Sequence, residues 1–239
     1  MAEPKYSRIL LKLSGEVLAG DKGFGIDSEK ASYLANEVRS VYELGIEIGL
    51  IIGAGNIFRG IQAAGNGMDR VTGDYLGMLA TIMNAITVQD ALEKANCDTR
   101  TLSAINIPQV AEPYIRRRAI RHLEKGRIVI ISGGTGNPFF TTDSAAALRA
   151  KELGAEIVIK GTKVNGVYDS DPMDNPNANK FDSISFSKVL SNNLRVMDLT
   201  AITLCKENNL PIQVFNINNP GDLKELVLGA KIGTLVKEV

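Results

Sequence analysis

Short apolar runs alternate with longer stretches of helical spacing along the chain, and this alternation limits the possible folds more than any other feature of the sequence. Apolar runs bounded by charged or turn-forming residues predict strands at 8–13, 46–52, 99–105, 127–132, 155–160 and 211–217. Strands that alternate with helices form a mostly parallel sheet covered on both faces. The sequence therefore predicts an α/β fold, a three-layer αβα sandwich, whose ligands bind where strands lead into helices.

Helices are predicted between these strands from the spacing of apolar residues. The stretch 28–44 begins after Asp27 or Ser28, either of which can cap it, and a second helix is expected over 74–96. Glycines follow the predicted ends of three helices: Gly45, Gly126 and Gly154.

Composition narrows the class of protein. The 239 residues include 27 basic and 27 acidic side chains, so the net charge does not favour binding to nucleic acid or to an anionic membrane. The two cysteines, Cys97 and Cys205, form no CxxC pair, which fits a reducing cytoplasm and argues against a zinc site. With no signal-peptide pattern and no apolar run of about 18 residues, we expect a cytoplasmic protein without membrane contact. We also expect a single domain over 1–239.

Several common nucleotide-binding and metal-binding patterns are absent from the sequence. No G-x-x-x-x-G-K-[ST] stretch occurs, so a Walker-type site is excluded. The only histidine, His122, cannot build a multi-histidine metal site, and we interpret its arginine-rich helix as a solvent or subunit face. Three glycine pairs lack the third glycine of a dinucleotide fingerprint: Gly23-x-Gly25, Gly53-x-Gly55 and Gly134-x-Gly136.

Polar residues and glycines gather at the predicted strand ends. Lys12 and Ser14 lie at the end of the first strand, and Gly15 opens the loop after it. Gly53 and Gly55 follow the second strand, and Arg59 is expected in the first turn of a helix. Two fixed cations beside glycine-lined helix starts form the kind of anion site that phosphates need. Because phosphoryl transfer depends largely on positioning and charge neutralisation, the combination favours a phosphotransferase.

Each of these residues also has a purely structural interpretation. Lys12 could protect an edge strand against aggregation, and Gly53 with Gly55 could form a simple tight turn. Residues near predicted helix starts could be N-caps, and the adjacent phenylalanines could belong to the core. These residues are Asp74, Asp143, Thr141, Thr142, Phe139 and Phe140.

Six segments together resemble the bacterial uridylate (UMP) kinases of the amino acid kinase family: KLSGE, GAGNIFRG, GDYLGMLAT, GTGNPFFTTDSAA, TKVNGVYDSDP and VMDLTA. They match in register from about Ser7 to the C-terminal strand. GTGNPFFTTDSAA and GMLAT are specific to that kinase, whereas KLSG and the glycine turn are shared with aspartokinases, acetylglutamate kinases and carbamate kinases. The resemblance implies a carbamate kinase-like fold and reversible, direct transfer of the ATP γ-phosphoryl group to UMP, giving UDP for pyrimidine nucleotide synthesis.

The resemblance also implies site residues. For the ATP phosphates and the transfer step they are Lys12, Leu13, Ser14, Gly15, Gly55 and Arg59, and for the ATP nucleoside they are Thr162, Asn165, Tyr168 and Asp171. For UMP they are Ala54, Asp74, Thr135, Gly136, Asn137, Pro138, Phe139, Phe140, Thr141 and Thr142. Lys12 and Arg59 would neutralise the migrating group, and Asp143 would organise the lysine rather than act as a base. The part from about 155 would bind mainly the ATP nucleoside, and the part before it UMP and neighbouring subunits.

Only the resemblance implies how the protein is regulated and how its subunits assemble. Gly20, Asp21, Lys22, Gly23, Phe24 and Gly25 match a loop tied to GTP activation. The resemblance implies a homohexamer, activation by GTP, inhibition by UTP, and Mg²⁺ that enters as Mg-ATP without a protein ligand. Ala54 replaces the middle glycine of the usual turn and is tolerable if its φ is negative. Asn165 stands where Asp is frequent, and it keeps hydrogen-bonding capacity without the charge.

Three other functions remain open at this point. The chain could be another amino acid kinase family enzyme that acts on a carboxylate or carbamate, such as acetylglutamate kinase. It could be a non-catalytic nucleotide-binding or oxyanion-storage protein on the same fold, like the molybdenum and tungsten storage protein of the family. A regulator that binds nucleotide and DNA is a third possibility. Retention of Lys12, Arg59 and Asp143 argues against lost catalysis.

Overall fold

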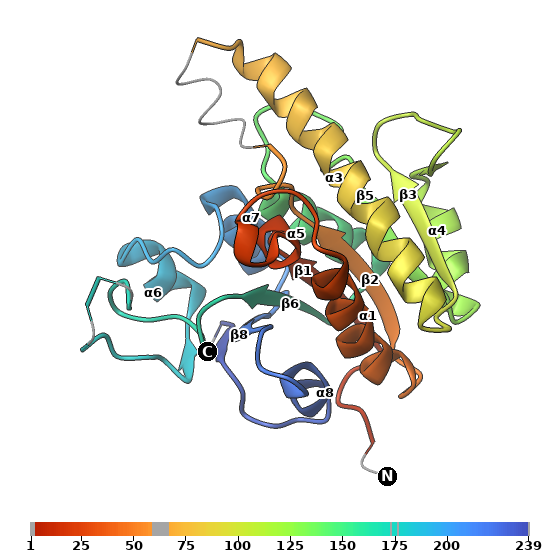
Figure 1. The fold of residues 1–239 in the computed structure, drawn as a ribbon. Helices are drawn as coiled ribbons and strands as arrows, with labels where there is room; N and C mark the ends of the chain where they lie inside the picture. The colour runs from red at the N-terminus through yellow and green to blue at the C-terminus, as the bar shows by residue number, and fades with distance from the viewer. Residues whose placement is uncertain (1–2, 59–66, 173, 176, 239) are drawn as a thin grey trace.

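The computed structural model describes residues 3–58, 67–172, 174–175 and 177–238. Within them, a nine-stranded sheet runs in the order β4-β3-β5-β2-β1-β6-β8-β9-β7 (Figure 1). The strands are β1 Arg8–Leu13, β2 Glu47–Ile52, β3 Thr99–Ser103, β4 Glu112–Pro113, β5 Ile128–Ser132, β6 Ile157–Thr162, β7 Ser183–Ile184, β8 Ile212–Asn216 and β9 Thr234–Val236. Every neighbouring pair is parallel except β8 with β9. The predicted α/β class and mostly parallel sheet are confirmed.

Helices cover both faces of this sheet. The α-helices are α1 Ser28–Tyr42, α3 Arg70–Lys94, α4 Arg116–Glu124, α5 Thr142–Leu153, α6 Phe186–Ser191, α7 Leu199–Glu207 and α8 Asp222–Val227. Two short 3-10 helices, η1 Gly15–Leu18 and η2 Gly20–Lys22, follow β1. None of the helices in the described part of the chain is long and apolar enough to cross a membrane.

The alternation of side chains along β1 divides the core into two halves. Ile9 and Leu11 pack in one cluster with residues of α1, α3 and α8. Leu10 packs in the other cluster with residues of α4, α5, α6 and α7. Because successive strand residues point to opposite faces, a continuous apolar run such as this one buries both faces of the sheet. The result is the predicted three-layer sandwich (Figure 1).

Most element boundaries differ from the predictions by one or two residues, and one helix start differs more. β6 begins at Ile157, two residues later than expected, and the two-residue and three-residue strands β4, β7 and β9 were not predicted. The helix expected over 74–96 begins at Arg70, because Asp69 caps it by accepting a hydrogen bond from Thr72 N at 2.9 Å. Asp74 therefore lies in the second turn, and its interpretation as an N-cap is wrong. A glycine at position 73 usually weakens a helix, which hid the true start.

Candidate active site

Lys12 lies on the central strand of the sheet and is only 6% exposed. β1 pairs with β2 on one side and with β6 on the other, so Lys12 is not an edge-strand lysine, and that interpretation is wrong. Its Nζ forms an ion pair with Asp143 Oδ1 at 2.5 Å. A buried ammonium is costly unless it is paired, and here the pairing carboxylate comes from the first turn of α5.

A second lysine shares the same carboxylate. Lys160 on β6 stands opposite Lys12 in the strand register, and its Nζ lies 3.0 Å from Asp143 Oδ2. It also donates to the carbonyl of Val196 at 2.6 Å. Lys160 was not predicted, although it ends the predicted strand 155–160 and Lys12 lies one residue before the end of the predicted strand 8–13.

The charges of this lysine cluster, defined as Lys12, Asp143 and Lys160, are strongly coupled. Burial raises the pKa of Asp143, but the two lysines outweigh that effect and hold the pKa at about 2. Burial lowers the pKa of Lys160, as does the positive charge of Lys12, and Asp143 opposes both. The cluster carries two cations against one carboxylate, which suits it to bind an anion.

The start of α5 is fixed by hydroxyl and carboxylate groups. Thr141 is the N-cap and accepts a hydrogen bond from Asp143 N at 3.0 Å, so Asp143 itself is not the cap. Asp198 accepts hydrogen bonds from the Thr141 hydroxyl and from Ser144 N, the latter at 3.2 Å. Asp198 also caps α7 through Ala201 N at 2.8 Å. Asp198 was not predicted as a site residue, although an aspartate before a helical run is a recognisable signal.

The glycine turn after β2 brings two backbone segments into contact. A Cβ at Gly15 would clash with the carbonyl of Gly53 and with the Asn56 side chain, so only glycine fits there. Buried Asn84 holds the turn from α3 by donating to Gly53 O at 2.7 Å. Ala54 is not among the residues with positive φ, so alanine fits without strain. Arg59 lies outside the described residues.

A cavity of about 520 Å³ opens beside this turn. Six residues of the expected UMP site line it: Ala54, Asp74, Thr135, Phe140, Thr141 and Thr142. Gly55 lines it as well, although it was expected at the ATP phosphates. The remaining expected residues, Gly136, Asn137, Pro138 and Phe139, do not line it. Seven further residues line the cavity that were not predicted as site residues: Glu16, Phe58, Gly73, Gly77, Met78, Thr81 and Gly134.

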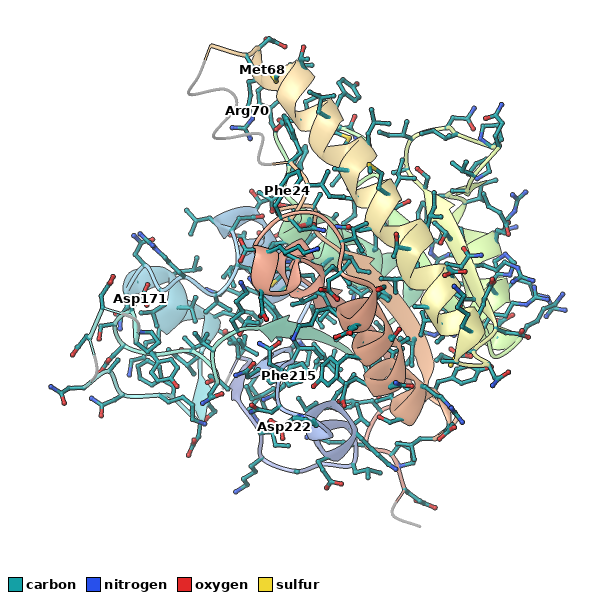
Figure 2. The ribbon with its side chains drawn as sticks, viewed as in Figure 1. Phe24, Met68, Arg70, Asp171, Phe215 and Asp222 are labelled. Atoms are coloured by element: carbon teal, nitrogen blue, oxygen red, sulfur yellow. The ribbon has the colours of Figure 1, made fainter. Side chains whose placement is uncertain are left out.

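Asp74 joins α3 to the loop before α5. Its carboxylate accepts hydrogen bonds from Arg70 Nε at 2.9 Å and from Phe139 N at 2.7 Å. Figure 2 shows Arg70 near the start of α3. Phe139 has a φ of 72°, a conformation that costs energy for a residue with a bulky side chain. The charge-assisted bond to Asp74 stabilises that conformation.

A second cavity, of about 530 Å³, lies in the C-terminal half of the chain. Tyr168 and Asp171 line it, and Figure 2 shows Asp171 well away from α3. Thr162 and Asn165 do not line it. Thr162 instead donates to Val164 O at 2.8 Å, and Asn165 Oδ1 accepts from Asn216 at 3.0 Å. Arg195 lines the cavity and was not predicted.

Residues that neighbour the lysine cluster line both cavities. Thr142 lines the first cavity and is followed by Asp143, and Arg195 lines the second and is followed by Val196, which binds Lys160. Leu13, Ser14 and Gly15 follow Lys12 at the same strand end. The lysine cluster therefore lies next to residues that line each of the two cavities, although none of its own members lines either.

The loop expected to bind GTP contacts the glycine turn. Gly25 N donates to Asn56 O at 2.7 Å, and Asn56 Nδ2 donates back to Gly25 O at 2.8 Å. Gly20, Asp21 and Lys22 form η2, Gly23 has a positive φ, and Phe24 is 69% exposed. In the described residues no group of three or more His, Cys, Asp or Glu side chains could hold a metal ion.

The chain is similar to known proteins over nearly its whole length. The model of the amino acid kinase family matches residues 7–216. The crystal structure of UMP kinase from Bacillus anthracis is 41% identical, covers 98% of this chain and 96% of its own, and superposes with a TM-score of 0.94. UMP kinase from Ureaplasma parvum is 38% identical, with 98% and 100% covered and a TM-score of 0.91. Uridylate kinase from Archaeoglobus fulgidus is 27% identical, with 95% and 99% covered and a TM-score of 0.74.

Proposed function

Since the chain belongs to the amino acid kinase family, we propose that it is a UMP kinase, which transfers the γ-phosphoryl group of ATP to UMP and forms UDP and ADP. The observation that carries this proposal is the lysine cluster, whose chain neighbours and contacts line two cavities of about 520 and 530 Å³. Identity of 41% and 38% to two UMP kinases over nearly the whole chain supports UMP as the acceptor.

UMP binds in the cavity that Ala54, Asp74 and Thr142 line, and the ATP nucleoside binds in the cavity beside Tyr168 and Asp171. Asp74 is placed to accept from ribose hydroxyls, because a carboxylate offers more acceptor sites than Arg70 and Phe139 N occupy. Arg59 is proposed to act with Lys12 at the phosphates. We assign the part before about 155 mainly to UMP and the part after it to the ATP nucleoside, within one domain over 1–239.

The chemical step needs no general base. An oxygen of the UMP phosphate is already a nucleophile, so it bonds to the γ-phosphorus as the bond to the β,γ-bridging oxygen breaks and ADP leaves. Lys12 and Lys160 neutralise charge that develops on the transferred group. Asp143 keeps the two ammonium groups in place and remains ionised, because its pKa is held at about 2.

Magnesium is proposed to arrive with ATP. Both oxygens of Asp143 are engaged by lysines, so this carboxylate does not fit a protein-held metal site. Mg²⁺ on the ATP phosphates would add charge neutralisation there.

We also propose the regulation and assembly that the family resemblance implies. GTP would activate through the loop Gly20–Gly25, which is hydrogen-bonded to the glycine turn, and UTP would inhibit. Exposed apolar residues along α3 support association into a homohexamer: Leu76, Leu79, Met83 and Ile86. The free, buried thiols of Cys97 and Cys205 fit a cytoplasmic enzyme that supplies UTP and CTP synthesis.

The experiment is an ADP-coupled assay with Mg-ATP in which UMP, CMP, TMP and N-acetylglutamate are compared as acceptors, with and without GTP. We expect turnover with UMP alone. No turnover with UMP would refute the proposal, and turnover with N-acetylglutamate would assign the chain to a different enzyme of the family.

A further inference from the structure

One arginine is buried in α5, the helix that carries Asp143. Arg149 lies on α5 and is 7% exposed, among alanines of the same helix that are fully buried. Burial of a guanidinium group costs several kcal/mol unless it is paired and hydrogen-bonded, and apolar residues of similar volume often serve stability as well or better. The presence of a charge here therefore calls for a role besides packing.

Two neighbouring side chains hold the Arg149 guanidinium in one orientation. Its carbon atom Cζ lies 4.1 Å from the centre of the Tyr114 ring, and Nη1 donates to Glu152 Oε2 at 2.8 Å. The Tyr114 hydroxyl donates to the same carboxylate oxygen at 2.7 Å. Arg149 Nε has no hydrogen-bond partner among the described residues. Because the guanidinium group is planar, fixing it in this way also fixes the direction in which Nη2 points.

Arg149 Nη2 contacts the loop before α5, residues 133–140, which we call the acceptor loop. Arg149 Nη2 donates to the carbonyl of Thr135 at 3.3 Å, and Thr135 lines the first cavity. The acceptor loop contains three glycines with positive φ, a composition that leaves a loop adaptable unless other groups fix it. These glycines are Gly133, Gly134 and Gly136.

Among the described residues, two further side chains anchor the acceptor loop by hydrogen bonds, and both come from α3. Thr81 Oγ1 accepts from Gly133 N at 2.8 Å, and Asp74 Oδ2 accepts from Phe139 N at 2.7 Å. Both of these residues line the cavity, whereas Arg149 does not. Arg149 anchors the loop from α5, outside the cavity, and so takes up none of the surface that would contact the ligand.

We propose that Arg149 is a positioning residue for UMP: it holds the Thr135 carbonyl, and with it the acceptor loop, in the conformation that binds the nucleotide. Tyr114 and Glu152 keep the guanidinium aligned for this contact. The proposal rests on the proposed function, because it takes the first cavity to be the UMP site.

The test measures binding of UMP and of Mg-ATP separately, by calorimetry, to the full-length protein and its variants. Arg149→Met removes the donors at similar side-chain length, and Arg149→Lys keeps the charge without the planar fork. We expect Arg149→Met to raise the Kd for UMP about tenfold, the scale of a lost hydrogen bond from a charged donor, and to leave the Kd for Mg-ATP within about twofold. Arg149→Lys is expected to raise the UMP Kd by a smaller factor.

A matched control is Arg118→Met, which removes an exposed arginine that pairs with Glu112 at 3.5 Å on the surface. It should change neither Kd. Hydrogen exchange supplies a second measurement, in which the amides of the acceptor loop should exchange faster in both Arg149 variants without ligand. If Arg149→Met does not fold, Arg149→Lys carries both tests.

Unchanged UMP binding in the folded variants, or equal loss of UMP and Mg-ATP binding, would overturn the role of Arg149. Wild-type protein that binds Mg-ATP but no UMP would overturn the assignment of the cavity itself, and with it this proposal. The two failures are therefore distinguished before any variant is compared.

Discussion

At the scale of single residues, the central feature is one carboxylate shared by two lysines, of which Lys12 is buried and Lys160 partly buried. Asp143 makes ion pairs of 2.5 Å with Lys12 and 3.0 Å with Lys160. Removing one member of a buried ion pair is expensive, because the remaining charge stays buried without its partner. Asp143 is therefore expected to matter for stability as well as for turnover.

Asp143→Asn is expected to lower kcat more than it weakens UMP binding, because the amide cannot hold both ammonium groups. It should also lower the free energy of unfolding by about 3–5 kcal/mol. Steady-state kinetics and urea unfolding measure the two effects. The control is Asp90→Asn, whose ion pair with Lys94 is solvent-exposed and should contribute no more than about 1 kcal/mol. A loss confined to the UMP KM would place Asp143 in the acceptor site instead.

Lys12 and Asp143 could be predicted as site residues from the sequence, whereas Lys160, Asp198 and Arg149 were not predicted. Lys12 follows a clear strand signal, and Asp143 belongs to a family-specific segment. The importance of Lys160 comes from its strand register opposite Lys12, which is a long-range property. Arg149 likewise depends on contacts with Tyr114 and Thr135 that no local pattern encodes.

At the scale of secondary structure, the N-terminus of α5 is the element on which the site depends. Its cap, Thr141, lines the first cavity and also donates to Asp198, so a residue that stabilises the helix also lies at the proposed UMP site. Six strands could be predicted because each has a long apolar run. The sandwich could be predicted because these strands alternate with helices. β4 and β7 are too short to show a pattern, and β9 is defined by antiparallel pairing with distant β8.

Thr141→Val is expected to lower the free energy of unfolding by about 1 kcal/mol, the usual effect of a lost N-cap, and to raise the KM for UMP. Ser185→Ala is the matched control, because Ser185 caps α6 by accepting from Lys188 N at 3.2 Å and lines neither cavity. It should lower stability to a similar extent and leave the UMP KM unchanged. Equal effects of the two variants on KM would contradict a special role for the cap of α5.

At the scale of the whole molecule, the low pKa of Asp143 couples folding to pH. The folded-state pKa of about 2 lies below the ordinary value of 3.8, so this carboxylate stabilises the fold fully above pH 3.8. That contribution is lost as the pH falls towards 2. Protonation of Asp143 is therefore not expected to limit activity between pH 5 and 8.

The difference in the free energy of unfolding between wild type and Asp143→Asn should shrink by about 1 kcal/mol between pH 5 and pH 3. Urea titrations of both proteins at several pH values in this range measure it. A constant difference would mean that Asp143 has an ordinary pKa in the folded protein.

The central claim is that the lysine cluster stabilises the phosphoryl group during its transfer. The most direct test is to measure kcat for Lys12→Ala with saturating Mg-ATP and UMP. The variant must first be shown by circular dichroism to be folded. We predict a kcat lower by roughly 10²–10³, the scale on which removal of one preorganised charge-stabilising group acts. A near-normal kcat would contradict the claim and place the transfer step elsewhere.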